Sequence, residues 1–268
     1  MGPPIFVVDA FTAEPFGGNP AGVVLDHGDP AWMQRVAAEM RHSETAFVRP
    51  RADRTGYELR WFTPQVEIDL CGHATLASAH VLFETGHAKR DETISFDTRS
   101  GTLRAAHAGD DGVTLDFPIS EPRRLGTAHA GLYAALGLDP GEGECLAADG
   151  AFFLCIVDEA ATVRELQPDI TALRALTDVR GVYVSAPGDK GYDIVSRCFG
   201  PRVGIDEDPV TGSMHCVLAA YWCPRLGTEE MRAFQASARG GEMTVRRAGD
   251  RVLLTGRATT VLSGELSA

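Results

Sequence analysis

The sequence has no clustered positive charge. No run of Lys and Arg exceeds two residues, and the chain carries a formal net charge of −12 with a pI of about 5.1. Binding to nucleic acid needs grouped Lys and Arg, and an acidic protein is repelled by anionic membranes. We therefore expect neither partner. An anionic substrate would have to be attracted locally, against the field of the whole protein.

Long apolar runs and paired cysteines are also absent. No apolar stretch approaches the roughly 18 to 20 residues that span a bilayer. The six cysteines (71, 145, 155, 198, 216 and 223) contain no C-x-x-C pair, which argues against a zinc knuckle and a dithiol redox motif. Scattered single cysteines fit a reducing cytoplasm, and this is the compartment we expect.

Strand and helix signals alternate along 268 residues, enough for one large or two ordinary domains. Asp29-Pro30 is typical of a helix start. Helices are predicted over 74–85, 127–136, 168–177, 213–223 and 229–236. Strands are predicted over 5–9, 57–62, 151–157, 181–185, 191–198, 242–247, 251–256 and 258–263, with further short strands within 93–117. Residues 117–122 resemble a linker.

Two stretches of the sequence repeat one another. Residues 62–69 and 199–206 match at five of eight positions, and an apolar helical pattern follows each, beginning at Gly72-His73 and Gly212-Ser213. We interpret this as a gene duplication that gives two similar lobes. Helix N-termini carry unpaired N–H groups and glycine admits close approach, so two such starts facing one cleft would bind a carboxylate.

Three polar residues are candidates for proton transfer, each with a plainer alternative. Glu44 precedes a strand and is either a proton shuttle or a surface loop glutamate. His73 is either a donor to an anion or a polar cap at its helix start. Asp208 lies in an acidic loop (204–213) whose spacing matches no EF-hand, so a metal is not expected.

Cys71 precedes Gly72, where a helix N-terminus lowers a thiol pKa and would make it a base or nucleophile. A two-base racemase needs a second thiol, but Thr211 stands at the matching position, which favours an inert buried Cys71. The glycine-rich turn 17–22, which contains Asn19, lacks the ending of a P-loop and is expected to shape the backbone near the cleft.

The whole set of motifs resembles the PhzF family of phenazine-biosynthesis-like isomerases, within the diaminopimelate-epimerase fold. The matching segments, in the family's order, are 8–12, 16–22, 43–47, 70–75, 207–213 and 239–241. The resemblance implies an α+β protein with two pseudo-symmetric lobes, each a curled, mainly antiparallel sheet around a central helix. We expect lobes at 1–118 and 124–268, with the final strand free to return to the first lobe.

The resemblance also implies site roles, an active site between the lobes, no cofactor, no metal and a homodimer. Glu44 matches the general acid/base, and burial would hold its pKa above the usual value of about 4.3. His73 and Asp208 match polar residues that contact the substrate. The expected substrate-binding residues are Gly72, Gly212, Ser213 and Asn19.

The sequence thus predicts an isomerase that moves a proton on a small cyclic or amino carboxylate, with Glu44 removing and returning it. One alternative is a cysteine-dependent epimerase or racemase that uses Cys71. Another is a non-catalytic binding module for a small molecule or a protein on the same scaffold.

Overall fold

The computed structural model of the chain describes residues 2–125, 130–139 and 142–267. Contacts within the chain divide it into two compact units. Unit 1 comprises residues 1–117 and 253–268, and unit 2 comprises residues 118–252. Of the helices in the described part of the chain, none is both long and apolar enough to cross a membrane.

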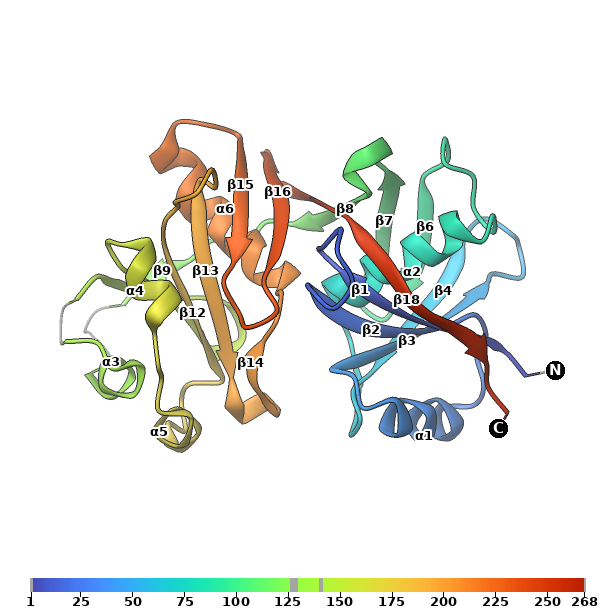
Figure 1. Ribbon diagram of the computed structural model, residues 1–268, viewed down its shortest axis with the longest axis horizontal. Coiled ribbons are helices and arrows are strands. Elements are labelled where there is room, and N and C mark those ends of the chain that lie inside the picture. The colour runs from blue at the N-terminus through green and yellow to red at the C-terminus, as the bar shows by residue number, and fades with distance from the viewer. Residues whose placement is uncertain (1, 126–129, 140–141, 268) are drawn as a thin grey trace. The chain divides into compact units, whose positions relative to one another are not determined.

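Unit 1 is built on one continuous set of strand ladders (Figure 1). Its strands are β1 (Pro4–Ala10), β2 (Asn19–Val24), β3 (Glu44–Pro50), β4 (Tyr57–Phe62), β5 (Glu67–Ile68), β6 (Ile94–Thr98), β7 (Gly101–His107), β8 (Val113–Pro118) and β18 (Ala258–Glu265). The pairing order is β18-β1-β2-β3-β4-β6-β7-β8, with β5 also on β4. Among these ladders of the described residues, β2–β3 and β4–β6 are the parallel ones.

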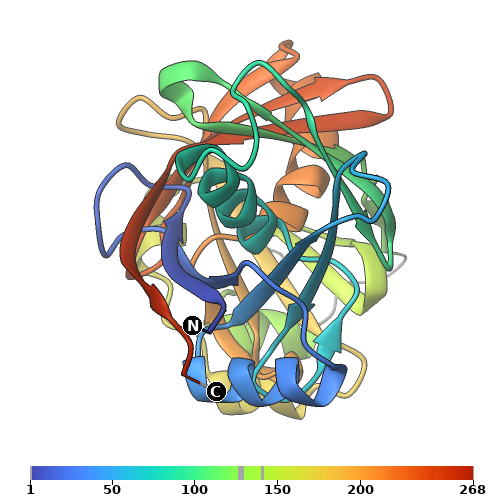
Figure 2. The ribbon, with the colours of Figure 1, turned by 90° about the vertical axis from the view of Figure 1, so that its right-hand side faces the viewer.

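Helix α2 (Gly72–Glu84) is the central element of unit 1. It contacts β1, β2, β3, β7 and β18, and Figure 2 shows it surrounded by strands. Eleven of its thirteen residues are buried, so it is apolar on every side, as a helix enclosed by a sheet must be. Helix α1 (Pro30–Met40) instead contacts β3 and β4 through one apolar face.

Unit 2 has its own strands and a second central helix, α6 (Gly212–Leu226). Its strands are β9 (Arg123–Arg124), β10 (Glu144–Ala147), β11 (Phe152–Ile156), β12 (Gly181–Pro187), β13 (Ile194–Gly200), β14 (Ile205–Asp208), β15 (Glu230–Gln235) and β16 (Gly241–Ala248). Strand β17 (Arg251–Gly256) spans the boundary between the units. The other α-helices in the described part of unit 2 are α3 (Ala130–Leu136), α4 (Ala160–Glu165) and α5 (Ile170–Ala175).

The two units have the same ladder order. In unit 2 it runs β9-β10-β11-β12-β13-β15-β16, with β14 on β13, and β11–β12 and β13–β15 are the parallel pairs. Even the register repeats. Thr45 lies opposite Phe62, and the residues 137 positions later, Val182 and Phe199, also lie opposite one another. The internal repeat in the sequence therefore corresponds to two structurally equivalent units.

The predicted helix over 229–236 is wrong, because this segment is strand β15. Glu, Met, Arg and Ala favour helices in isolation, but burial alternates along the segment, with Met231, Ala233 and Gln235 inside. Pairing with both β13 and β16 overrides the local preference. The predicted helix over 127–136 corresponds to α3, although residues 126–129 lie outside the described part.

Candidate active site

Glu44 is the first residue of β3, and its side chain is buried, with 6% of the residue exposed. The parallel β2–β3 ladder places it opposite Ala21. A carboxylate is seldom buried this deeply unless it is paired. The surface-loop alternative for Glu44 therefore does not describe its surroundings.

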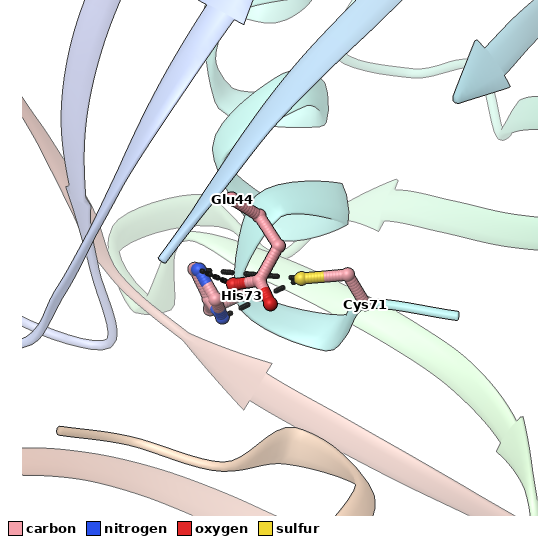
Figure 3. Close-up of side chains that lie close together, drawn as sticks. All are labelled: Glu44, Cys71 and His73. Carbon is pink, nitrogen blue, oxygen red and sulfur yellow. Dashed lines mark hydrogen bonds and ion pairs between the residues drawn. The ribbon is translucent and has the colours of Figure 1, made fainter. Parts of the chain in front are cut away.

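The partner of Glu44 is His73, the second residue of α2, which is likewise buried. Its Nε2 atom lies 3.2 Å from Glu44 Oε2. The Sγ of Cys71 lies 3.5 Å from Nδ1 and 4.0 Å from Nε2 of the same ring. Figure 3 shows the three side chains converging at the start of α2.

Two further polar side chains hold the imidazole. Asn19 Nδ2 lies 3.2 Å from His73 Nδ1, and Ser43 Oγ lies 3.3 Å from Nε2. Ser43 also donates to Asn19 Oδ1 at 3.4 Å. Because the Asn19 amide N–H faces Nδ1, this nitrogen is the acceptor, and the proton of a neutral ring is on Nε2, where Ser43 Oγ can accept it.

Burial, aided by the charge on His42, lowers the pKa of His73 to about 3. His73 is therefore neutral near pH 7. Its 3.2 Å contact with Glu44 therefore joins a neutral ring to the carboxylate and is not an ion pair. Such an imidazole can donate and accept protons without carrying a permanent charge.

The central helices differ from α1 and α5 at their N-termini. Asp29 caps α1 by accepting from Trp32 N, and Asp169 caps α5 by accepting from Ala172 N. Within the described chain, the N-cap side chains of α2 and α6, Cys71 and Thr211, make no such hydrogen bond. A helix start without a side-chain cap can offer its first N–H groups to an anion.

The remaining predicted residues gather in unit 2, around the start of α6. Asp208, at the end of β14, accepts a hydrogen bond of 2.5 Å from Thr211 Oγ1. Gln235 donates to Asp208 O at 2.7 Å and accepts from Thr211 N at 2.7 Å. Gly212 is buried, whereas Ser213 is exposed. The structure brings Glu44, His73 and Asn19 together in unit 1.

Cys71, His73 and Glu44 are also the described residues that could together hold a metal ion. Their ligand atoms all lie within 4.8 Å of one another. A thiolate, an imidazole and a carboxylate form a donor set that suits zinc. The same three groups suit direct proton transfer, so the cluster alone does not require a metal.

The repeat shows what unit 2 lacks. The register that pairs Ala21 with Glu44 in unit 1 pairs Phe152 with Gly181 in unit 2. Gly181 therefore occupies the position of Glu44, and Thr211 takes that of Cys71 as N-cap. Thr211 is thus the structural equivalent of Cys71, as the sequence predicted.

Sequence reasoning gave no role to Ser43 or Gln235. Ser43 directly precedes Glu44 in the motif 43–47, and this adjacency was the available signal. Gln235 lay within the segment predicted as a helix, so no pattern connected it with Asp208 and Thr211. Both residues form hydrogen bonds with the candidate residues beside them: Ser43 with Asn19 and His73, and Gln235 with Asp208.

Each unit, with its curled ladder and enclosed helix, defines the α+β fold of diaminopimelate-epimerase-like enzymes. The chain superimposes on a predicted epimerase from Pseudomonas aeruginosa with a TM-score of 0.79 at 21% identity, covering 99% of both chains. A hydroxyproline epimerase from Agrobacterium vitis gives 0.63 at 14% identity, covering 98% of this chain and 91% of the other. At these identities the likeness establishes the fold alone.

The family follows from closer relatives. The family model described as phenazine biosynthesis-like protein matches residues 8–264. An uncharacterised isomerase from Halalkalibacterium halodurans is 45% identical over 99% of both chains, and the human phenazine biosynthesis-like domain-containing protein is 39% identical over 99% of both. A crystal structure of an Enterococcus faecalis PhzF-family protein gives a TM-score of 0.91 at 41% identity over the whole of both chains. The chain belongs to the phenazine biosynthesis-like (PhzF) family and is an enzyme of the isomerase class.

Proposed function

We propose that the chain is a cofactor-independent isomerase that moves a proton on a small cyclic or amino carboxylate. The observation that carries the proposal is the buried Glu44 carboxylate, 3.2 Å from a neutral His73 at a helix start without a side-chain cap. In this mechanism Glu44 takes a proton from one carbon of the substrate and returns it to another carbon. His73 contacts the Glu44 carboxylate and fixes its orientation.

The substrate class is argued from the helix N-termini. The first turns of α2 and α6, at Gly72, Gly212 and Ser213, offer backbone N–H groups to a carboxylate and to the negative charge that develops on proton removal. This recognition needs no Lys or Arg, which suits a chain with a net charge of −12. Asn19 and Asp208 complete the proposed set as polar contacts to the substrate.

Cys71 keeps a second function open, that of a thiol-dependent epimerase. Its Sγ lies 3.5 Å from His73 Nδ1, close enough for proton exchange with the imidazole. Against this, the equivalent residue in unit 2 is Thr211, so an equivalent second thiol is missing. We therefore assign the proton transfer to Glu44 and leave Cys71 as a neighbour of His73.

Solvent-deuterium exchange tests the assignment. A panel of small cyclic and amino carboxylates is screened for thermal stabilisation of the chain, since a ligand that binds the native state raises its melting temperature. Those that bind are incubated with the chain in D₂O and a chelator. We expect Glu44→Gln to lower the exchange rate roughly 10²- to 10⁴-fold, and Cys71→Ser to retain most of it.

Each alternative has its own signature in this experiment. If Cys71→Ser abolished exchange and Glu44→Gln preserved it, the thiol would be the base. If carboxylates stabilised the chain but none exchanged a proton, the chain would be a binding protein. Melting temperatures of the free variants serve as the control for folding.

We also propose that the protein is a cytoplasmic homodimer that binds neither nucleic acid nor a membrane. All six cysteines are free thiols, which supports a reducing compartment. Light scattering of the purified chain would measure the dimer. A monomer that turns over substrate would contradict this part of the proposal.

A further inference from the structure

Two cysteines of unit 2 face one another across neighbouring strands. Cys145 in β10 and Cys155 in β11 are direct partners in the antiparallel ladder. Their Sγ atoms lie 3.3 Å apart, and both thiols are free. The pair belongs to unit 2, whereas Glu44, Cys71 and His73 belong to unit 1. It is therefore unrelated to the proposed proton transfer.

The hydrogen-bond pattern of the hairpin identifies the type of pair. Ala148 N donates to Phe152 O at 2.8 Å, so residues 148 and 152 form a hydrogen-bonded pair. Such pairs alternate with non-hydrogen-bonded pairs along an antiparallel ladder, and three steps along, Cys145 and Cys155 form one of the latter. In these pairs the Cα atoms lie about 4.5 Å apart, within the roughly 4.4–6.8 Å that a disulfide spans. A bond can form without strand movement.

The two thiols differ in accessibility. Cys155 is part of the apolar core of unit 2 and is 1% exposed, whereas Cys145 is only partly buried at the edge of that core. A hydrogen bond from Cys155 lowers the pKa of Cys145, aided by the backbone N–H of Leu146, while the same bond and burial raise the pKa of Cys155. Cys145 is therefore the attacking thiol and Cys155 the resolving one.

We infer that Cys145 and Cys155 form a redox-modification site whose reactant is a low-molecular-weight disulfide of the glutathione type. The Cys145 thiolate attacks one sulfur of that disulfide, its S–S bond breaks, and one glutathione leaves as a thiolate. Cys155 then loses its proton and attacks the Cys145 sulfur, which displaces the second glutathione. The protein loses two electrons, and one oxidised glutathione becomes two reduced molecules.

Other cysteines of the described chain are poorly suited to this reaction. Burial raises the pKa of Cys216 to about 12, and burial together with the charge of Asp208 raises that of Cys198 further. Cys223 is 2% exposed within α6. These thiols are therefore expected to remain reduced under conditions that oxidise the β10–β11 pair.

The test titrates the unmodified full-length chain with glutathione buffers of increasing oxidised fraction, followed by alkylation and mass spectrometry. We expect two of the six thiols to disappear together, with a mass lower by two hydrogen atoms and a cross-linked peptide containing residues 145 and 155. Excess dithiothreitol should restore both thiols. A disulfide between other cysteines, or six thiols throughout the titration, would overturn the inference.

Substitutions separate the two steps. Cys155→Ser should stop at a mixed disulfide, with one glutathione on Cys145, and Cys145→Ser should give no adduct on Cys155. The matched control, Cys223→Ser, should form the cross-link as the unmodified chain does. Equal glutathione adducts on Cys145→Ser and Cys155→Ser would contradict the assigned roles. The mapping on the unmodified chain keeps the inference testable even if a variant folds poorly.

Discussion

Two buried histidines lie in the first turns of the two central helices. His73 is the second residue of α2, and His215 is the fourth of α6. His215 Nδ1 donates to Thr211 O at 2.8 Å, and its buried Nε2 has no hydrogen-bond partner among the described residues. Burial lowers the pKa of His215 to about 4 and that of His73 to about 3. Both rings are therefore neutral in the folded chain near pH 7.

This predicts a loss of stability in mild acid. The unfolded chain binds protons at these histidines near pH 6.5, whereas the folded chain does so only near pH 4 and pH 3. Their contribution is therefore fully present above about pH 6.5 and is lost as the pH falls toward the folded values. Each histidine contributes a slope of about 1.4 kcal/mol per pH unit between its two pKa values.

Urea unfolding at pH 7.5, 6 and 5 measures this slope. His215→Gln should reduce it by the share of one proton, because glutamine does not titrate. The exposed His87→Gln is the control and should leave the profile unchanged. A profile for His215→Gln identical to that of the unmodified chain would show that His215 binds its proton equally in the folded and unfolded states, which contradicts the prediction.

The pairing of Glu44 with His73 could not be read from the sequence. Both residues were candidates, but they are 29 positions apart, and their contact depends on the β2–β3 register and on where α2 begins. Local patterns do not specify either feature. The contact of Asn19 with His73 depends equally on β2 starting at residue 19. Sequence therefore identified the candidate groups, and long-range pairing determined their geometry.

At the scale of elements, Gln235 ties strand β15 to the start of α6. Its buried side chain satisfies Thr211 N and Asp208 O with two hydrogen bonds of 2.7 Å. Leucine has a similar volume but offers neither a donor nor an acceptor. We expect Gln235→Leu to lower the free energy of unfolding by about 2–4 kcal/mol, since both backbone groups lose their partner.

Chemical denaturation of this variant beside Gln65→Leu gives the comparison. Gln65 is exposed, and its substitution should change stability by less than about 0.5 kcal/mol. If the two variants were equally stable, the hydrogen bonds of Gln235 would contribute nothing net. The activity of the Gln235→Leu variant should fall as well, because the backbone carbonyl of Asp208 would lose the side chain that holds it.

Most other elements were predictable because their signals were local. Asp29 caps α1 as its sequence indicated, and Gly86, with a positive φ of 74°, follows the end of α2. Strand β15 was missed because the helix propensity of its residues disagreed with the strand-like alternation of buried and exposed positions. The internal repeat offered the correction, since 137 positions earlier lies β6, which was predicted as a strand.

At the scale of the whole molecule, one architecture is used twice with different chemistry. The ladders of both units follow the same order, yet Gly181 stands in the position of Glu44 and Thr211 in that of Cys71. The polar residues at the helix starts differ, and in unit 2 the carboxylate beside the N-cap Thr211 is that of Asp208, at the end of β14.

The last strand completes the first unit. Strand β18 pairs with β1 from Pro4↔Glu265 to Ala10↔Ala258 and contacts α2. Deleting residues 258–268 should leave one edge of β1 unpaired and speed the hydrogen exchange of its amides by roughly tenfold or more. The control is a chain that ends at Leu266, which keeps the hydrogen bond from Leu266 N to Pro3 O. Equal protection of β1 in both chains would contradict this.

During synthesis on the ribosome, the pairing of β1 with β18 is delayed. Strand β1 emerges first, but β18 is translated roughly 250 residues later, which at about 5–20 residues per second takes roughly 13–50 s. Residues 118–252 form one continuous stretch and are complete before that. The nascent chain must therefore keep the apolar edge of β1 from associating with other chains, a period in which chaperones would be expected to bind it.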